Sequence, residues 1–266
     1  MEWWLLYLVA GAVAGLLAGL LGVGGGVIVV PALAGIFAAQ GVPPHDTMRL
    51  ALGTSLAAIV LTALASVRVH HVQRAVDWRI VLRLTPGLVF GAFAGANLAS
   101  RAPSSVLALA FGLFLWCVAT YLIIDATPQG AGSLPGWFGL SAVGGTIGLV
   151  SGVMGIGGGT LTVPFLTWSR VPLHQAIGTA AAAGLPIAVA GGAGYLLSGV
   201  ALGASPPNSV GFVHVPALVG VSVASVIAAP IGARLTHHLP TGLLKKLFAL
   251  FLYLVGGLVA LSGWPT

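Results

Sequence analysis

The chain has 266 residues, of which 58% are hydrophobic and only 5% are charged, and its mean hydropathy is +1.08. Soluble domains carry roughly 25% charged residues, so this composition excludes a water-soluble globular protein. The formal net charge of +6 comes from basic residues in short connections, which is typical of a membrane-orientation signal rather than a nucleic-acid-binding surface.

Apolar segments follow one another along the chain and are long enough to cross a bilayer as helices. A spanning helix needs about 20 apolar residues, whereas the strands of a membrane β-barrel have about ten residues of alternating polarity. The sequence therefore predicts an all-α polytopic membrane protein with eight long helices and two short ones. We expect the helices at 3–21, 27–39, 50–67, 80–100, 104–124, 136–154, 160–168, 174–197, 211–236 and 241–263.

The two halves of the chain are copies of one unit. Residues 11–31 overlay residues 144–164 without gaps and with ten identities in 21 positions. Both copies contain a glycine run followed by a proline: Gly22-Val-Gly-Gly-Gly26 with Pro31, and Gly155-Ile-Gly-Gly-Gly159 with Pro164. We interpret residues 1–125 as a first repeat, 126–135 as a linker and 136–266 as a second repeat.

Basic residues indicate that the repeats are inverted. In the second half, the connection between the second and third long helices, 198–208, is uncharged. The matching connection of the first half is rich in basic residues, namely Arg68, His70, His71, Arg74, Arg79 and Arg83. The next connection reverses this contrast, with Arg101 alone in the first half against Arg234, His237, His238, Lys245 and Lys246 in the second. By the positive-inside rule, equivalent connections lie on opposite sides of the membrane. An odd number of segments per half is then required, so we expect five, with the chain reversing at each glycine run.

Paired breaks in membrane helices predict a binding site. Irregular backbone at membrane depth is tolerated where it lines a cavity, and broken helices in matching positions of two repeats mark transporter sites. A helix that begins inside the bilayer presents unpaired N–H groups and a partial positive charge, and glycine lets an anion approach closely. Alternatively, the glycines only permit tight packing, although each costs about 1 kcal/mol in a helix interior. The candidate anion-binding residues are Gly24, Gly25, Gly26, Gly157, Gly158 and Gly159.

Hydroxyl groups are the main polar side chains near these breaks. Thr160 follows the second break, and Thr54, Ser55 and Thr179 belong to the matched pairs Gly53-Thr54 and Gly178-Thr179. They are candidates for binding an anion, although any one of them can instead bond its own helix backbone. Arg49 aligns with His174 just before these pairs. Both are candidates for cationic vestibule groups, or else for anchors of helix ends.

Several other chemistries lack the residues they need. No carboxylate lies in the middle of an expected span, so a relay of buried acids has no candidate. The histidine pairs have no acidic or cysteine partners and are interpreted as interfacial anchors, and the single cysteine, Cys117, excludes an intramolecular disulfide. Ser151 has no base in the membrane to activate it as a nucleophile. We therefore expect neither an enzyme nor a metal or organic cofactor.

The duplicated segments resemble a known transporter family. Gly19-Leu-Leu-Gly-Val-Gly-Gly-Gly-Val-Ile-Val-Val-Pro31, Gly152-Val-Met-Gly-Ile-Gly-Gly-Gly-Thr-Leu-Thr-Val-Pro164 and the Gly-Thr pairs are similar to the sulfite exporter TauE/SafE family. The resemblance also takes in Ala75-Val-Asp-Trp78, so it spans nearly the whole chain. It implies a multi-pass permease of the cytoplasmic membrane for sulfite, an organosulfonate or a related sulfur oxyanion. One departure is that Thr179 is followed by Ala180, where the first copy has Ser55.

The resemblance and the electrostatics of the breaks suggest one mechanism. A small anion binds between the two breaks, and rocking of the repeats exposes it to each side in turn. The alternative is an ion channel or a cation exchanger that uses the carbonyl ends of the broken helices. The partners expected are the small anion and the lipid bilayer, with no nucleic acid.

Overall fold

The computed structural model describes residues 2–21, 25–124, 133–204, 206–235 and 241–262. This part of the chain is almost entirely helical, as predicted. Its ten helices are α1 (Glu2–Leu21), α2 (Gly26–Ala39), α3 (Pro44–Val72), α4 (Trp78–Arg101), α5 (Ser104–Ile124), α6 (Trp137–Met154), α7 (Gly159–Trp168), α8 (Leu173–Ala201), α9 (Val215–Leu235) and α10 (Thr241–Ser262). Between α8 and α9 lies an antiparallel hairpin of β1 (Ser209–Val210) and β2 (Val213–His214).

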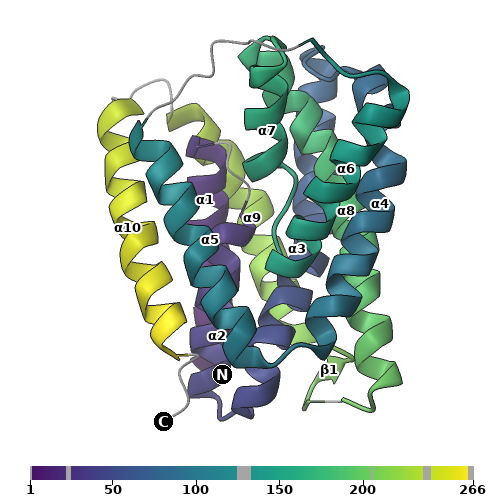
Figure 1. Cartoon of the computed structure of the whole chain (residues 1–266). Coiled ribbons are helices and arrows are strands. Elements are labelled where there is room, and N and C mark those ends of the chain that lie inside the picture. The colour runs from purple at the N-terminus through teal and green to yellow at the C-terminus, as the bar shows by residue number, and fades with distance from the viewer. Residues whose placement is uncertain (1, 22–24, 125–132, 205, 236–240, 263–266) are drawn as a thin grey trace.

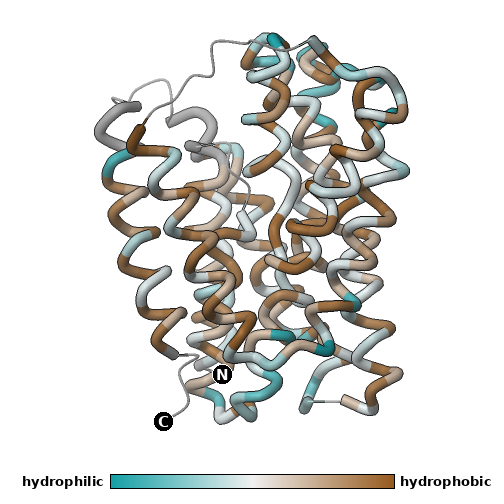
Figure 2. The backbone as a smooth tube through the Cα atoms, in the orientation of Figure 1, coloured by the Kyte–Doolittle hydropathy of each residue, from teal (hydrophilic) through white to brown (hydrophobic). Residues whose placement is uncertain are grey.

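Five helices are long and apolar enough to cross a membrane, namely α3, α4, α5, α6 and α8. Other apolar stretches of 10–17 residues lie in α1, α2, α9 and α10. Hydrophobic residues run along the helices, while hydrophilic ones gather toward the two ends of the bundle (Figure 2). The protein is a multi-pass membrane protein.

The two ends of the bundle are distinguished here as the lower and upper faces of Figure 1. The lower face holds the start of α1, the end of α10 and the hairpin, and the upper face holds the connection from α3 to α4. The short helix α2 runs from the interior to the lower face, whereas α7 runs from the interior to the upper face (Figure 1). The two short helices thus leave the interior in opposite directions.

Two equivalent helix pairs pack closely through faces that contain glycines. In one pair, α1 packs on α9, and a Cβ built on Gly11 would lie only 2.4 Å from the carbonyl oxygen of Val221. In the other, α6 packs on α4, and a Cβ on Gly144 would lie 2.4 Å from the carbonyl oxygen of Leu84. No side chain fits at either approach. The first helix of each half therefore packs on the fourth helix of the other half.

Some helix boundaries differ from the predicted ones. Helix α3 begins at Pro44 rather than near residue 50, because Pro43 and Pro44 start a helix whose first turns are polar. Helix α4 begins at Trp78, so Arg79 and Arg83 lie on a helix and not in the preceding connection. The hairpin replaces the predicted start of a helix at residue 211, where Gly211 has a positive φ of 56°. Most of the proposed linker 126–135 and residues 22–24 of the first break lie outside the described residues.

Candidate functional site

The second glycine break separates α6 from α7 inside the bundle. Helix α6 ends at Met154, and Gly155 turns the chain with a left-handed φ of 65°, a conformation that favours glycine. The Ile156 N–H then donates to the carbonyl of Ser151 at 3.1 Å. Helix α7 begins at Gly159 with Gly158 as its N-cap residue. The first N–H groups of an α-helix have no carbonyl partner within the helix, and in α7 this first turn adjoins the break.

The first break ends in the same way at the start of α2. Gly25 is the N-cap residue, and its carbonyl accepts from the N–H groups of Ile28 at 3.1 Å and Val29 at 2.9 Å. No side chain caps either short helix. The predicted site residue Gly24 lies outside the described residues.

The structure brings the two breaks into direct contact. A Cβ built on Gly26 would lie 2.8 Å from the Gly155 carbonyl oxygen and 2.8 Å from the Ile156 Cα. Ser55 joins them, because its Oγ donates to the Gly155 carbonyl oxygen at 2.8 Å. Glycines far apart in the sequence therefore lie side by side, and Ser55 reaches the break of the opposite half.

Space around the glycines of the site is uneven. A Cβ on Gly157 would lie 3.4 Å from Ile59 Cγ2, and one on Gly25 would meet no described residue closer than 4.0 Å. By contrast, a Cβ on Gly158 would lie 3.0 Å from the Gly184 backbone nitrogen. Gly157 and Gly158 are buried. Gly25 and Gly157 can therefore accept a methyl group, whereas Gly26 cannot.

Thr54 and Thr179 lie in equivalent positions and make equivalent bonds. The Thr54 Oγ1 accepts from the backbone N–H of His214 at 2.9 Å, and the Thr179 Oγ1 accepts from the backbone N–H of Asp77 at 3.0 Å. Both threonines are fully buried. Each hydroxyl thus holds the connection that leads into α9 or α4, at opposite faces of the bundle. We call these two bonds the threonine locks.

The glycine before each threonine lets that connection approach. A Cβ on Gly53 would lie 2.2 Å from the Phe212 carbonyl oxygen, and one on Gly178 would lie 2.4 Å from that of Ala75. The sequence predicted the Gly-Thr pairs but not their partners. The sequence contains one signal for these partners. Gly95-Ala96 before Pro103 matches Gly232-Ala233 before Pro240 at a spacing of 137 positions, and Asp77 and His214 have the same spacing.

Asp77 and His214, whose N–H groups the two threonines bind, also accept hydrogen bonds at the starts of the next helices. The Asp77 Oδ1 accepts from the N–H groups of Arg79 at 2.9 Å and Ile80 at 3.3 Å, which caps α4. The His214 Nδ1 accepts from the Ala217 N–H at 3.2 Å near the start of α9. One turn of α3, from Leu52 to Ser55, therefore contacts the second break through Leu52 and Ser55 and the hairpin through Gly53 and Thr54.

Two further buried hydroxyls lie near the second break, of which the sequence indicates Thr162, beside Thr160, as a polar group after the break, but not Ser151 as a binding residue. Ser151 and Thr162 are fully buried, and their oxygen atoms have no hydrogen-bond partner among the described residues. The predicted residue Thr160 lies in the first turn of α7, in a partly exposed position. In the first half, the residues aligned with Thr160 and Thr162 are the buried Val27 and Val29. The polar side chains thus belong to the second break.

The two predicted vestibule residues lie at opposite faces. Arg49 lies near the start of α3, where its Nε and Nη2 donate to the Ala102 carbonyl at 3.2 and 2.9 Å. His174 is exposed at the start of α8. Neither reaches the breaks, and Arg49 anchors the connection between α4 and α5.

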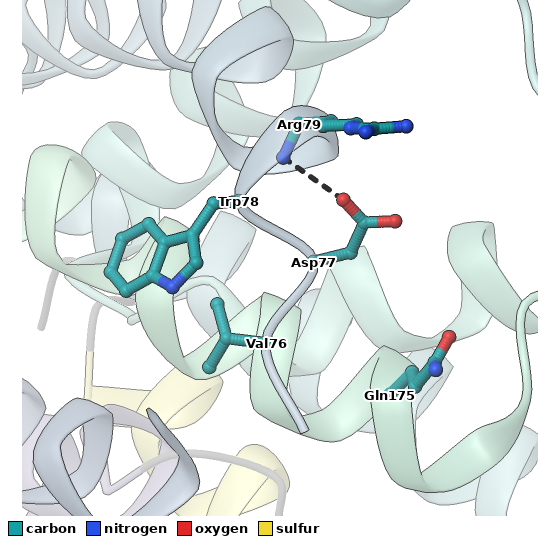
Figure 3. Close-up of a pocket in the computed structure, with 5 residues that line it drawn as sticks. All are labelled: Val76, Asp77, Trp78, Arg79 and Gln175. Carbon is teal, nitrogen blue, oxygen red and sulfur yellow. Dashed lines mark hydrogen bonds between the residues drawn. The ribbon is translucent and has the colours of Figure 1, made fainter. Parts of the chain in front are cut away.

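Each face holds a pocket built from equivalent elements. The upper pocket, of about 350 Å³, lies between the connection into α4 and the start of α8, and Figure 3 shows Asp77, Arg79 and Gln175 on its polar side. The lower pocket, of about 680 Å³, lies between the start of α3, the end of α4 and the connection from α8 to α9. Arg49 and Arg101 line the lower pocket.

Comparison with known proteins gives a consistent family assignment. The family described as "Sulfite exporter TauE/SafE" matches residues 7–259. A probable membrane transporter protein of Haemophilus influenzae is 35% identical over 257 residues, which cover 94% of this chain and 96% of the relative. Two further probable membrane transporter proteins are similar. That of Methanocaldococcus jannaschii is 28% identical over 85% of this chain and 81% of its own length, and YdhB of Bacillus subtilis is 26% identical over 90% and 91%.

Proposed function

The chain belongs to the sulfite exporter TauE/SafE family of membrane transporters, and from this premise we propose that it carries a small sulfur-containing oxyanion bound at the paired glycine breaks. The family and the relatives are transporters rather than enzymes, in line with the sequence. The observation that carries the proposal is the contact of Gly26 with Gly155 and Ile156, which brings the start of α2 against the break between α6 and α7 inside the bundle.

The starts of α2 and α7 suit an anion. The unpaired N–H groups and the partial positive charge of a helix start bind negative groups without a basic side chain. Neutral donors hold an oxyanion while still letting it leave. Ser151 and Thr162 supply further buried hydroxyls in α6 and α7 that have no other partner among the described residues.

Three carbonyls near the end of α6, which a cation would need, already accept hydrogen bonds. At the end of α6, the Gly155 carbonyl accepts from Ser55 Oγ, and the Ser151 carbonyl accepts from the Ile156 N–H. The Val153 carbonyl accepts from the Tyr195 hydroxyl at 3.3 Å. These bonds favour the anion over the cation channel or exchanger that the sequence left open.

Inverted repeats give the carrier its means of exposing the site to each side. Three features support them: α1 packs on α9 as α6 packs on α4, the threonine locks lie at opposite faces, and α2 and α7 leave the interior in opposite directions. Each lock fixes the connection beside one pocket. Alternating release of these two connections would open the breaks to one face at a time.

The basic residues orient the protein in the cytoplasmic membrane. Among the described residues, the connections from α3 to α4 and from α7 to α8 and the helix ends beside them carry Arg68, Arg74, Arg79 and Arg170, whereas the start of α3 and the end of α4 carry Arg49 and Arg101. By the positive-inside rule, we propose that the upper face is the cytoplasmic one.

The test is the flux of sulfite and methanesulfonate in proteoliposomes containing Gly157→Ala or Gly25→Ala. Both glycines accept a methyl group, so the variants should fold, but the methyl keeps an anion from the backbone N–H groups. Loss of one hydrogen bond to a charged group costs about 1.5–3 kcal/mol, so the half-saturating concentration should rise about tenfold or more.

The matched controls are Gly145→Ala in α6 and Gly35→Ala in α2. A Cβ at Gly145 meets nothing closer than 4.0 Å and one at Gly35 nothing within 4 Å, and neither residue is at a break. Unchanged half-saturation in the Gly157 and Gly25 variants would refute the site. Absence of saturable flux of either anion in the wild-type protein would refute the substrate class.

A further inference from the structure

The lower pocket differs from the upper one in charge. Its walls contain two arginines, Arg49 and Arg101, and one carboxylate, Asp46. The walls of the upper pocket contain one arginine, Arg79, and one carboxylate, Asp77. Among the described lining residues, and counting only these groups, the lower pocket keeps one surplus positive charge, and the upper pocket has none.

Arg49 is held in place and compensates Asp46. Its Nε and Nη2 share the Ala102 carbonyl, and its guanidinium lies 5.7 Å from the centre of the Phe212 ring. The Arg49 Nη1 lies 3.5 Å from Asp46 Oδ1, and His45 Nε2 lies 3.3 Å from Asp46 Oδ2. Both carboxylate oxygens thus already face a cationic or donor group, and Asp46 leaves Arg101 uncompensated.

Arg101 is the surplus cation. It is the last residue of α4, it is exposed, and it forms no ion pair within the part of the chain that the structure describes. Its guanidinium has five N–H donors that suit an oxyanion. In a hollow with apolar walls, a cation attracts anions more strongly than it does on an open surface.

We propose that the lower pocket is a second anion-binding site, in which Arg101 captures a small oxyanion at the mouth and the paired Arg49 and Asp46 form a fixed wall. The pocket volume of about 680 Å³ leaves room for a hydrated inorganic anion or for an organosulfonate. The site is separate from the glycine breaks. It would collect or release the anion at the lower face.

A cysteine in place of Leu202 reports on this pocket directly. Leu202 lines it and is exposed, and the natural Cys117, which is also exposed, is removed by Cys117→Ala. The rates of modification of the Leu202→Cys protein by an anionic and a cationic methanethiosulfonate reagent are compared in detergent. The anionic reagent should react faster. Arg101→Glu should lower the anionic-to-cationic ratio on the order of tenfold, while Arg101→Lys preserves it.

Bound anion should also protect the cysteine. Millimolar sulfate or methanesulfonate should slow modification by a neutral reagent in the Arg101 protein and not in the Arg101→Glu protein. The control is Arg68→Glu on the upper face, which should change neither the ratio nor the protection. An unchanged ratio in Arg101→Glu, or protection that survives this substitution, would overturn the proposal. The measurement needs no transport, so its result is independent of the test at the glycine breaks.

Discussion

Replacing Thr54 by valine tests whether the threonine locks hold the connections in place. Valine has the same shape but no oxygen, so the His214 N–H loses its acceptor while the packing is kept. Thr54 is fully buried, His214 is 6% exposed, and the lost bond is 2.9 Å long. A buried donor without a partner costs about 1–3 kcal/mol, which changes the unfolding equilibrium by about 5- to 150-fold.

The equivalent change Thr179→Val should cost less. The Asp77 N–H is only partly buried, so water can replace the lost acceptor, and we expect about 0.5–1.5 kcal/mol. Thr85→Val is the matched control, because the Thr85 hydroxyl only bonds the Val81 carbonyl of its own helix at 2.8 Å. That change should stay within about 0.5 kcal/mol.

Two measurements in detergent check these values. Denaturant unfolding followed by tryptophan fluorescence gives the free energies, and amide hydrogen exchange locates the effect. Exchange should rise at residues 208–217 in Thr54→Val and at residues 73–80 in Thr179→Val, each without the other. If Thr54→Val unfolds like the Thr85→Val control, or if exchange at His214 is unchanged, the hydroxyl does not lock the hairpin.

Two further predictions follow from the same contacts. Gly26→Ala should destabilise the protein by about 1–3 kcal/mol or prevent folding, because its Cβ would lie 2.8 Å from the Gly155 carbonyl oxygen. In the same denaturant-unfolding measurement, Gly35→Ala in the same helix should be neutral or stabilise the protein by about 0.5–1 kcal/mol. Equal stability of the two variants would contradict the contact. Burial lowers the pKa of His214, in the hairpin, from its ordinary value near 6.5, so the unfolded chain binds more protons there than the folded one. The free energy of unfolding should therefore keep its full contribution from His214 above about pH 6.5 and decrease as the pH drops from there toward the lowered pKa. His214→Asn should remove this part of the pH dependence in unfolding curves. A dependence that persists in His214→Asn would assign it to another group.

The sequence predicted the helical membrane fold and the starts of both short helices. Three successive glycines interrupt a helix so strongly that the predicted starts of α2 and α7, residues 27 and 160, differ by one residue from the observed starts, Gly26 and Gly159. It did not predict the hairpin, because a turn of four residues with Gly211 inside a long apolar stretch carries little signal. The polar first turns of α3 were also missed, since hydropathy alone reads His45, Asp46 and Arg49 as a connection.

The partners in the candidate site could not be predicted for a different reason. Ser55 bonds a carbonyl 100 residues away, and Thr54 bonds an N–H 160 residues away. Such pairs depend on how the helices pack, and no local pattern encodes them. The duplicated sequence still marked the right positions, because equivalent residues of the two halves perform equivalent tasks in the locks.

The central claim is that a small oxyanion binds where the two glycine breaks meet. Diffraction from crystals grown with selenite, in which selenium replaces the sulfur of sulfite as an anomalous scatterer, tests it most directly. We predict an anomalous peak within hydrogen-bonding distance of the N–H groups of Gly157 to Gly159, beside Gly26 and Ser55. A peak in the lower pocket alone, or no peak at the breaks in protein that binds selenite in solution, would contradict the account.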